Sequence, residues 1–271
     1  MLKNREYLLN EMLKKKSMLC VGIDPDLSRI SSQFNSSGFL IVDFAKCIIE
    51  QTCEYAIAYK LNIAFFESLG PIGWEQLEQI KEFIPKECLF IADAKRADIG
   101  NTSSMYAKYF FERLDADAIT LHPYMGLDSL SPFLEHKSKW SIILALTSNP
   151  GSADFEKLKL ENGRLLYEEV LTHFSENISA DQAMFVVGAT HPDHFLRIRS
   201  IVPDHFLLVP GIGAQGGDLK ATIQLGKNDH GGLLINVGRS IIYPESKSSF
   251  EKDVQHAAKY FQSQMQEYWG I

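Results

Sequence analysis

Short apolar runs alternate with longer amphipathic stretches along the whole chain. Eight runs have the length and composition of buried strands, and they are Met18–Ile23, Ala56–Tyr59, Cys88–Ala92, Ala118–Leu121, Ser141–Leu146, Met184–Val187, Phe206–Val209 and Gly232–Val237. Helical patterns separate them, and these are Ile41–Tyr55, Trp74–Ile84, Ser103–Leu114, Leu127–His136, Gly163–Ser175, Pro192–Ile201, Asp218–Leu225 and Ser249–Tyr268. The start, Tyr7–Lys14, reads as a further amphipathic helix that closes one end of the domain.

Strands that alternate with helices predict a parallel sheet. Eight such units in roughly 250 residues predict a closed (β/α)8 TIM barrel. The alternative is a doubly wound open sheet, because the pattern does not itself prove closure. The segments Ser31–Gly38 and Asn149–Gly163 are expected to be loops, and no linker divides the chain. We therefore expect a single domain over residues 1–271, with an N-terminal helix.

Composition narrows the function classes. A net charge of -7 argues against a dedicated nucleic-acid binder, although it allows a local basic pocket for an anion. The four cysteines form no CxxC pair and predict buried thiols in a reducing compartment. The chain shows no apolar run of membrane-spanning length and no signal-peptide segment at its start, so we expect a cytoplasmic protein.

One stretch turns from apolar to charged within a single step, at the end of the third predicted strand. Cys88–Ala92 is followed by Asp93, Lys95 and Asp98. Strand side chains alternate in direction, so Asp93 and Lys95 point the same way. Carboxylates beside a lysine are costly to bury unless they neutralise one another, which favours a buried ammonium in a catalytic cluster. The plainer interpretation is that Asp98 caps the next helix and pairs with Lys95 at the surface.

Other predicted strands also end in polar residues, where TIM barrels carry their working groups. They are Asp24, Lys60, His122, Thr147 with Ser148, Thr190, Gly211 with Gln215, and Gly238 with Arg239. We interpret His122 as a hydrogen-bonded structural histidine. Tyr59, Phe65 and Phe66 are interpreted as core or wall residues.

The last two units predict a phosphate site. Pro210-Gly-Ile-Gly-Ala-Gln-Gly-Gly217 follows the seventh strand and Val237-Gly-Arg-Ser240 follows the eighth. Glycines let backbone N–H groups approach an anion, and Arg239 offers a planar fork for phosphate oxygens. The pocket then has a phosphate end and, across the mouth, a charged end of Lys60, Asp93, Lys95 and Asp98. Metal-ligand spacing, a nucleophile elbow, a Walker loop and a Rossmann fingerprint are all absent from the sequence.

Together these motifs resemble the orotidine 5'-phosphate decarboxylase family, in its longer bacterial subgroup. The matching pieces are Val21-Gly-Ile-Asp24-Pro, Lys60-Leu-Asn-Ile-Ala-Phe-Phe-Glu67, Asp93-Ala-Lys-Arg-Ala-Asp-Ile-Gly-Asn-Thr102, Thr147-Ser-Asn-Pro-Gly151, Pro210-Gly-Ile-Gly-Ala-Gln215 and Asn236-Val-Gly-Arg239. Ala97 and Leu61 depart from the residues common in the subgroup. Tyr243 lies near the position of a phosphate-contacting tyrosine in other branches, but its spacing from Arg239 differs.

The resemblance implies a cofactor-free and metal-free decarboxylation of orotidine 5'-phosphate to UMP and CO2. It implies Lys95 as proton donor to C6, Asp93 beside the substrate carboxylate, and Lys60 with Asp98 completing the charge network. Further implied contacts are Asp24 and Lys60 on ribose hydroxyls, Ser148 on the pyrimidine edge, Gln215 on base and phosphate, and Gly238 with Arg239 on phosphate. It also implies a homodimer in which Asp98, Ile99 and Thr102 reach the partner's pocket.

Three rival interpretations stay open on the sequence. A metal-dependent sugar-phosphate barrel enzyme, such as a keto-gulonate-phosphate decarboxylase or hexulose-phosphate synthase, shares the Asp-x-Lys-x-x-Asp motif. An aldolase would use Lys60 or Lys95 to form a Schiff base. A non-catalytic barrel would bind a phosphorylated ligand without releasing CO2.

Overall fold

A computed structural model describes residues 3–34 and 39–271 of the chain. Eight parallel strands close into a barrel in sequence order, because β8 pairs with β1 as well as with β7. The strands are β1 (Leu19–Ile23), β2 (Ala56–Asn62), β3 (Leu89–Arg96), β4 (Ala118–Leu121), β5 (Trp140–Leu146), β6 (Ala183–Val187), β7 (Phe206–Val209) and β8 (Leu233–Val237). The predicted TIM barrel is therefore confirmed, and the open-sheet alternative is wrong.

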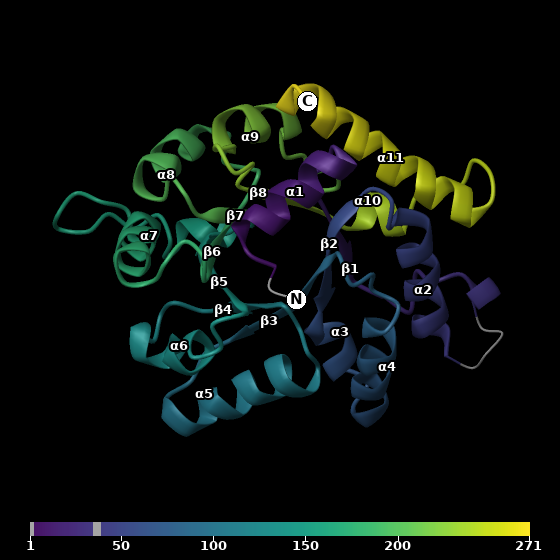
Figure 1. The fold of residues 1–271 in the computed structure, drawn as a ribbon, viewed down its shortest axis with the longest axis horizontal. Coiled ribbons are helices and arrows are strands. Elements are labelled where there is room, and N and C mark those ends of the chain that lie inside the picture. The colour runs from purple at the N-terminus through teal and green to yellow at the C-terminus, as the bar shows by residue number, and fades with distance from the viewer. Residues whose placement is uncertain (1–2, 35–38) are drawn as a thin grey trace.

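Helices surround the barrel and cover the outer face of its strands (Figure 1). They are α1 (Arg5–Lys15), α2 (Leu40–Thr52), α3 (Ile63–Glu67), α4 (Pro71–Lys81), α5 (Gly100–Ala107), α6 (Leu127–Leu134), α7 (Leu166–Asn177), α8 (Phe195–Ile201), α9 (Leu219–Gly226), α10 (Arg239–Ile242) and α11 (Phe250–Trp269). A π-helical segment, Lys108–Arg113, extends α5, and 3-10 turns occupy Ser32–Phe34, Pro150–Ala153 and Pro192–His194. Every predicted helix is present, with bounds that shift by a few residues.

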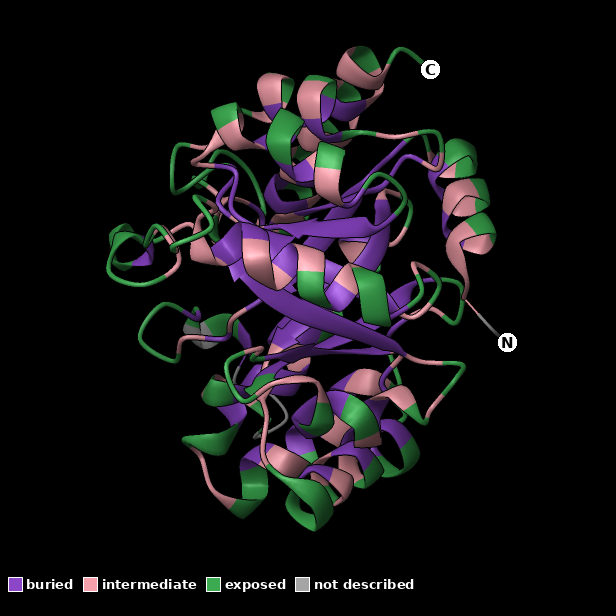
Figure 2. Cartoon of the chain, turned by 90° about the vertical axis from the view of Figure 1, so that its left-hand side faces the viewer, coloured by how far each residue is buried: buried purple, intermediate pink, exposed green. Residues whose placement is uncertain are grey.

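The strands are buried along almost their entire length, whereas the helices are buried on their inner sides only (Figure 2). The strands are buried on both faces because one face lines the packed interior of the barrel and the other lies against the helices. Tyr59 and Phe66 are fully buried, and Phe65 packs partly buried against the core. These three aromatic residues therefore have the core and wall positions predicted for them.

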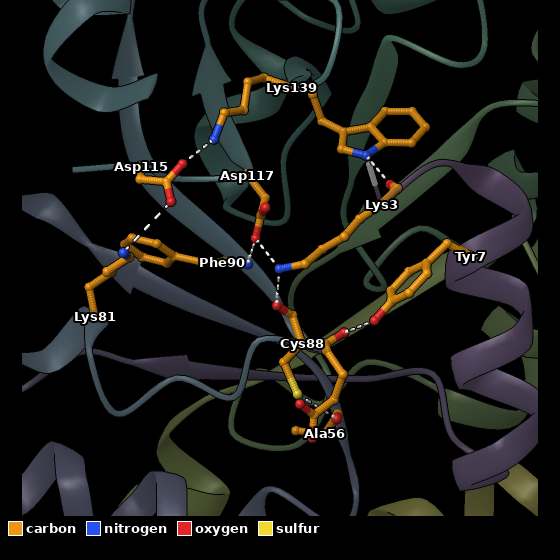
Figure 3. A network of polar contacts seen from close by, with 11 residues as sticks. Lys3, Tyr7, Ala56, Lys81, Cys88, Phe90, Asp115, Asp117 and Lys139 are labelled. Atoms are coloured by element: carbon orange, nitrogen blue, oxygen red, sulfur yellow. Dashed lines mark hydrogen bonds and ion pairs between the residues drawn. The ribbon is translucent and has the colours of Figure 1, made fainter. Parts of the chain in front are cut away.

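The N-terminal helix closes the end of the barrel at which the strands begin. The Lys3 ammonium donates hydrogen bonds to the Cys88 carbonyl and to the Asp117 carboxylate, both at 2.6 Å, and Tyr7 bonds to the Glu87 carbonyl (Figure 3). These partners lie at or just before the starts of β3 and β4. The expectation that this helix closes one end of the domain is confirmed, and the opposite end of the barrel stays open.

The predicted loops agree with the structure where it describes them. Residues 35–38 of the Ser31–Gly38 loop lie outside the described residues, and Asn149–Gly163 contains a short 3-10 turn. All four cysteines are free thiols, with Cys20 and Cys88 buried and the other two half-buried. Among residues 3–34 and 39–271, every helix is too short or too polar to span a membrane.

Candidate active site

Strand β3 carries an irregularity at the point where its sequence becomes charged. Between Ala92 and Arg96 the strand advances four residues, while its partner β4 advances only two, from Ile119 to Leu121. Strand β3 therefore has two extra residues, as in a β-bulge, and it continues past the predicted end at Ala92. Lys95 lies within the bulge with a φ of 49°, in the left-handed region that few residues other than glycine adopt.

The bulge brings three charged groups together at the open end of the barrel. The Asp93 carboxylate accepts from Lys95 Nζ at 2.6 Å through Oδ1 and from Lys60 Nζ at 2.8 Å through Oδ2. Asp93 and Lys60 have side chains that are 10% and 6% exposed. The Lys95 side chain is 45% exposed, so the expectation of a buried ammonium is wrong for Lys95 and holds for Lys60.

The surrounding charges keep this cluster ionised. Burial alone would raise the pKa of Asp93, but the ammonium groups of Lys60 and Lys95 outweigh it and hold that pKa well below its usual range. Burial would likewise lower the pKa of Lys60, yet the Asp93 and Asp24 carboxylates raise it above its ordinary value. A buried carboxylate between two ammonium groups therefore stays charged across neutral pH.

Asp24, at the end of β1, supplies the second carboxylate of this cluster within one chain. Its Oδ1 lies 3.9 Å from Lys60 Nζ and is buried without a hydrogen-bond partner among the described residues. A buried acceptor without a partner is costly unless a ligand or water satisfies it. This oxygen is thus available to a hydroxyl group that enters the mouth.

The structure does not bring Asp98 into the cluster of its own chain. Its carboxylate accepts from the Ile99 amide at 2.7 Å, and its own amide donates to Ser103. Lys95 pairs with Asp93 instead, so the surface pairing of Lys95 with Asp98 is absent from the described residues. Ile99 is 63% exposed, and the exposed Thr102 follows it in the first turn of α5.

Ser148 lies in a tight enclosure beyond the end of β5. A side chain at Gly188 would come within 2.7 Å of the Ser148 backbone, and one at Gly211 would lie 3.3 Å from Ser148 Cβ and 3.2 Å from Gln215 Oε1. Only glycine fits at Gly188 for this reason. Ser148 and Gln215 thus both lie beside the same face of Gly211, close enough to contact one ligand.

The loops after β7 and β8 lie against each other on the far side of the mouth. A Cβ on Gly213, which has a φ of 80°, would lie 2.5 Å from Ser240 Oγ, and one on Gly238 would lie 3.3 Å from the Gly22 carbonyl of β1. Arg239 is exposed and forms no ion pair within the part of the chain that the structure describes. Its charge is therefore free for an anionic ligand.

Tyr243 fixes the loop that follows β1. Its hydroxyl accepts from the Asp26 amide at 2.8 Å and lies 3.1 Å from the Asp24 carbonyl. The Arg29 guanidinium stacks over its ring at 4.1 Å. Tyr243 thus connects α10 to the segment that carries Asp24.

His122 differs from its interpretation as a hydrogen-bonded structural histidine. Its ring is exposed and forms no hydrogen bond to any described residue, while its amide donates to the Arg96 carbonyl. Partial burial and the nearby Lys95 charge lower the pKa of His122, which keeps the ring neutral. The interpretation of His122 as a histidine held by a side-chain hydrogen bond is therefore wrong.

Thr120 on β4 belongs to the site, although we did not predict it. Its hydroxyl donates to Asp93 Oδ1 at 2.9 Å and accepts from the Lys95 amide at 3.0 Å. The Thr120 hydroxyl therefore accepts the hydrogen bond that the Lys95 amide would give to a β4 carbonyl in a regular strand pair. The sequence could have indicated Thr120, because it is the only polar residue in the apolar run Ala118–Leu121.

The described residues contain no group of three His, Cys, Asp or Glu side chains placed to hold a metal ion. The arrangement instead offers an ammonium at Lys95 that faces the mouth and is steadied by an ionised Asp93. Such a pair can repel an incoming carboxylate through Asp93 and donate a proton through Lys95.

Comparisons with known proteins agree with this geometry. A family model described as "Orotidine 5'-phosphate decarboxylase / HUMPS family" matches residues 17–249. A Bacteroides fragilis protein named orotidine 5'-phosphate decarboxylase is 48% identical over 268 residues, covering 97% of each chain. A Flavobacterium johnsoniae protein of the same name is 47% identical over 265 residues, again covering 97% of each. The solved structure of Leishmania donovani OMP decarboxylase superposes with a TM-score of 0.84 at 38% identity, covering 99% of each chain.

Proposed function

The chain belongs to the orotidine 5'-phosphate decarboxylase family, and from that premise we propose that it converts orotidine 5'-phosphate to UMP and CO2 with Lys95 protonating C6. The reaction is the last step of de novo pyrimidine nucleotide synthesis, and the enzyme is a carboxy-lyase. The observation that carries the proposed role of Lys95 is its 2.6 Å contact with an Asp93 that is itself held by Lys60. No cofactor enters the proposed mechanism.

The chemistry demands strong electrostatic help. Loss of CO2 from C6 leaves a vinyl-type carbanion that no carbonyl is placed to delocalise. Enzymes that face such barriers supply up to about 23 kcal/mol, or a ~10^17-fold acceleration. Interactions that strengthen only as charge develops on C6 are the ones that raise the rate.

Asp93 and Lys95 divide this task. A substrate carboxylate at ~4 Å from Asp93 is repelled by roughly 4 kcal/mol at an effective dielectric near 20. Part of that repulsion persists in the transition state, so it supplies only a share of the acceleration. The Lys95 ammonium gains attraction as negative charge moves onto C6, and it then delivers its proton.

The remaining residues bind the nucleotide. We assign Asp24 and Lys60 to the ribose hydroxyls, which the buried and unpartnered Asp24 oxygen supports. We assign Ser148 and Gln215 to the base. The phosphate then lies on the Gly238 amide and Arg239.

We propose a homodimer whose active sites lie at the interface. Asp98 turns away from the lysines of its own chain, and Ile99 beside it exposes an apolar side chain. Tyr124 and Met125, in the loop after β4, are also exposed, at 90% and 45%. Burial of this apolar surface against a second copy would carry Asp98, Ile99 and Thr102 toward the partner's pocket.

We propose that residues 1–271 act as one catalytic domain, since a single closed barrel contains both ends of the site. Four free thiols support a reducing compartment, and we place the protein in the cytoplasm.

The test follows the loss of orotidine 5'-phosphate absorbance in the presence of a metal chelator. We expect full turnover with chelator, and we expect Lys95→Ala to lower kcat by more than about 10^4-fold, because it removes both the proton donor and the counter-charge. Circular dichroism of Lys95→Ala checks that the fold is retained.

Two results would count against the proposal. Activity that requires an added divalent metal would favour the sugar-phosphate barrel enzymes instead. Near-normal turnover by a folded Lys95→Ala variant would remove Lys95 as the proton donor.

A further inference from the structure

Glu156 clamps the residue that precedes Ser148. Its Oε2 accepts a hydrogen bond from the Thr147 amide at 2.7 Å, and its Oε1 lies 2.9 Å from the Thr147 hydroxyl, whose single proton is shared between this oxygen and Asn149 Oδ1 at 2.6 Å. Both oxygens of one carboxylate therefore hold a single residue at the end of β5. Hydrogen bonds to an ionised acceptor are about twice as strong as neutral ones.

The clamp is itself anchored in the helical layer. The Glu156 carbonyl accepts from the amide of Tyr167, in the first turn of α7, at 2.8 Å. The next residue, Lys157, places its Nζ 3.4 Å from His191 Nδ1 in the loop after β6. Glu156 thus transmits the position of α7 to the end of β5, although it lies eight residues beyond Ser148 in sequence.

Ser148 has two polar groups that are free to bind a ligand. Neither its amide nor its hydroxyl hydrogen-bonds to any described residue, while its carbonyl accepts from Thr190 at 3.1 Å. The peptide plane that carries the Ser148 amide begins at Thr147. Because Glu156 accepts from the Thr147 amide and contacts its hydroxyl, and because Gly188 packs against the Ser148 backbone, the direction of this amide is fixed.

We propose that Glu156 is a positioning residue that sets the preference of the site for a uracil-type over a cytosine-type pyrimidine edge. The inference rests on the proposed function, in which Ser148 reads that edge. A fixed amide is a donor only: it matches the carbonyl oxygen at C4 of uracil and opposes the amino group of cytosine. If Thr147 loses its contact with Glu156, the Ser148 amide can rotate, and the preference for uracil over cytosine should decrease.

Binding of UMP and CMP measures this preference directly. We expect the wild-type protein to bind UMP more tightly than CMP. Glu156→Ala should weaken UMP binding about tenfold, the equivalent of one hydrogen bond of roughly 1.4 kcal/mol, and should change CMP binding much less. Glu156→Gln keeps one acceptor oxygen and should fall between wild type and Glu156→Ala.

Glu169→Gln is the matched control. Glu169 lies on α7 in the same neighbourhood and bonds to Arg164 and Asn162, so its loss removes an equal charge without touching Thr147. We expect its ratio of UMP to CMP affinity to equal that of wild type. Near-ultraviolet circular dichroism of each variant reports the fold, and Glu156→Gln preserves the test if Glu156→Ala does not fold.

The possible results distinguish failure of the role assigned to Glu156 from failure of the proposed decarboxylase activity. An unchanged affinity ratio in folded Glu156→Gln and Glu156→Ala overturns the inference, as does equal loss of UMP and CMP binding. A wild-type protein that decarboxylates orotidine 5'-phosphate but binds the two nucleotides equally also overturns it and leaves the proposed function standing. A wild-type protein that neither turns over the substrate nor binds UMP overturns the proposed function itself.

Discussion

His205 is a buried histidine whose ring lies beside the backbone of Ile178. It is 6% exposed, and its ring lies 5.3 Å from that of Phe185. Burial lowers the pKa of His205 to about 4. A hydrogen bond with the Ile178 backbone opposes this lowering, the charges of Arg199 and Arg5 add to it, and Asp204 opposes it. The folded protein therefore holds this ring neutral where an unfolded chain would bind a proton.

Acid should destabilise the protein mainly through His205, whose pKa is lowered more than those of His122, His191 and His194, before the carboxylates titrate. The unfolded histidine has a pKa near ~6.5, so stability is complete above that pH and falls as the pH drops toward 4. Between pH 7 and pH 5 we expect a loss of about 2 kcal/mol in the free energy of unfolding. Urea denaturation at the two pH values measures it, and His205→Phe should remove most of the difference. If His205→Phe lost as much unfolding free energy as the wild type between pH 7 and pH 5, the pH dependence would come from other groups.

Single residues of the site divide into those that sequence reveals and those that it hides. Asp24, Lys60 and Asp93 are polar residues at the ends of apolar strands, and this local contrast identifies them. Glu156 carries no such contrast, because it lies in a polar loop and reaches Thr147 only after the chain folds back. The partners of Asp98 were equally hidden, since its neighbours in sequence do not show which way its loop turns.

At the scale of elements, one arginine joins four chain segments. The Arg199 guanidinium on α8 donates to the carbonyls of Gly226, Val202, His205 and Gly232, at distances from 2.5 to 3.0 Å. These carbonyls end α9 and α8 and precede β7 and β8. Burial lowers the pKa of Arg199 to about 10, so it remains charged at neutral pH.

Replacement of Arg199 by lysine should weaken this junction. An ammonium has three donors without the planar fork, so at least one buried carbonyl loses its partner. We expect Arg199→Lys to cost about 3 kcal/mol of unfolding free energy, measured by urea denaturation. Arg197→Lys is the control on the same helix, because the Arg197 side chain is 53% exposed and a lysine there can still pair with Glu168, so the loss should be less than about 1 kcal/mol. Equal effects of the two substitutions would contradict the role of Arg199.

Elements with strong periodicity were predictable, and short or irregular ones were not. All eight strands coincide with apolar runs in the sequence, and long helices such as α11 coincide with clear amphipathic patterns. The helices α3 and α10 are too short to show any period, and both lie directly after strands. The extension of β3 depends on pairing with β4 across a bulge, which is a tertiary contact that local pattern does not contain.

At the scale of the whole molecule, the two ends of the barrel have separate tasks. The end at which the strands begin is closed by α1 and by Lys3 just before it, which donates to Cys88 and Asp117 (Figure 3). The other end holds the charged cluster and the glycine loops. Closure of one end leaves the other as the only barrel mouth in the described structure, which is the usual division in barrels of this kind.

The proposed dimer predicts complementation between two inactive variants. In a mixture of Lys95→Ala and Asp98→Ala subunits, each hybrid dimer has one site with an intact Lys95 and an intact Asp98 from its partner. With random exchange, half of the dimers are hybrids with one working site each, so about a quarter of wild-type activity should return. A coupled assay of UMP formation after subunit exchange measures it.

Asp93→Ala provides the matched control for that exchange. Asp93 and Lys95 act from the same chain, so no hybrid of Lys95→Ala with Asp93→Ala contains a complete site. We expect no recovery in this mixture. Recovery in both mixtures, or in neither, would contradict an interface site completed by Asp98.

The left-handed backbone of Lys95 has a consequence for protein engineering. An L-residue in this conformation costs about 1–2 kcal/mol relative to glycine, so the chain gives up thermal robustness at the residue we assign to proton transfer. Directed evolution that selects only for heat tolerance would favour glycine or asparagine at this position and so accumulate well-folded but inert proteins. Libraries built on this scaffold should therefore keep codon 95 fixed.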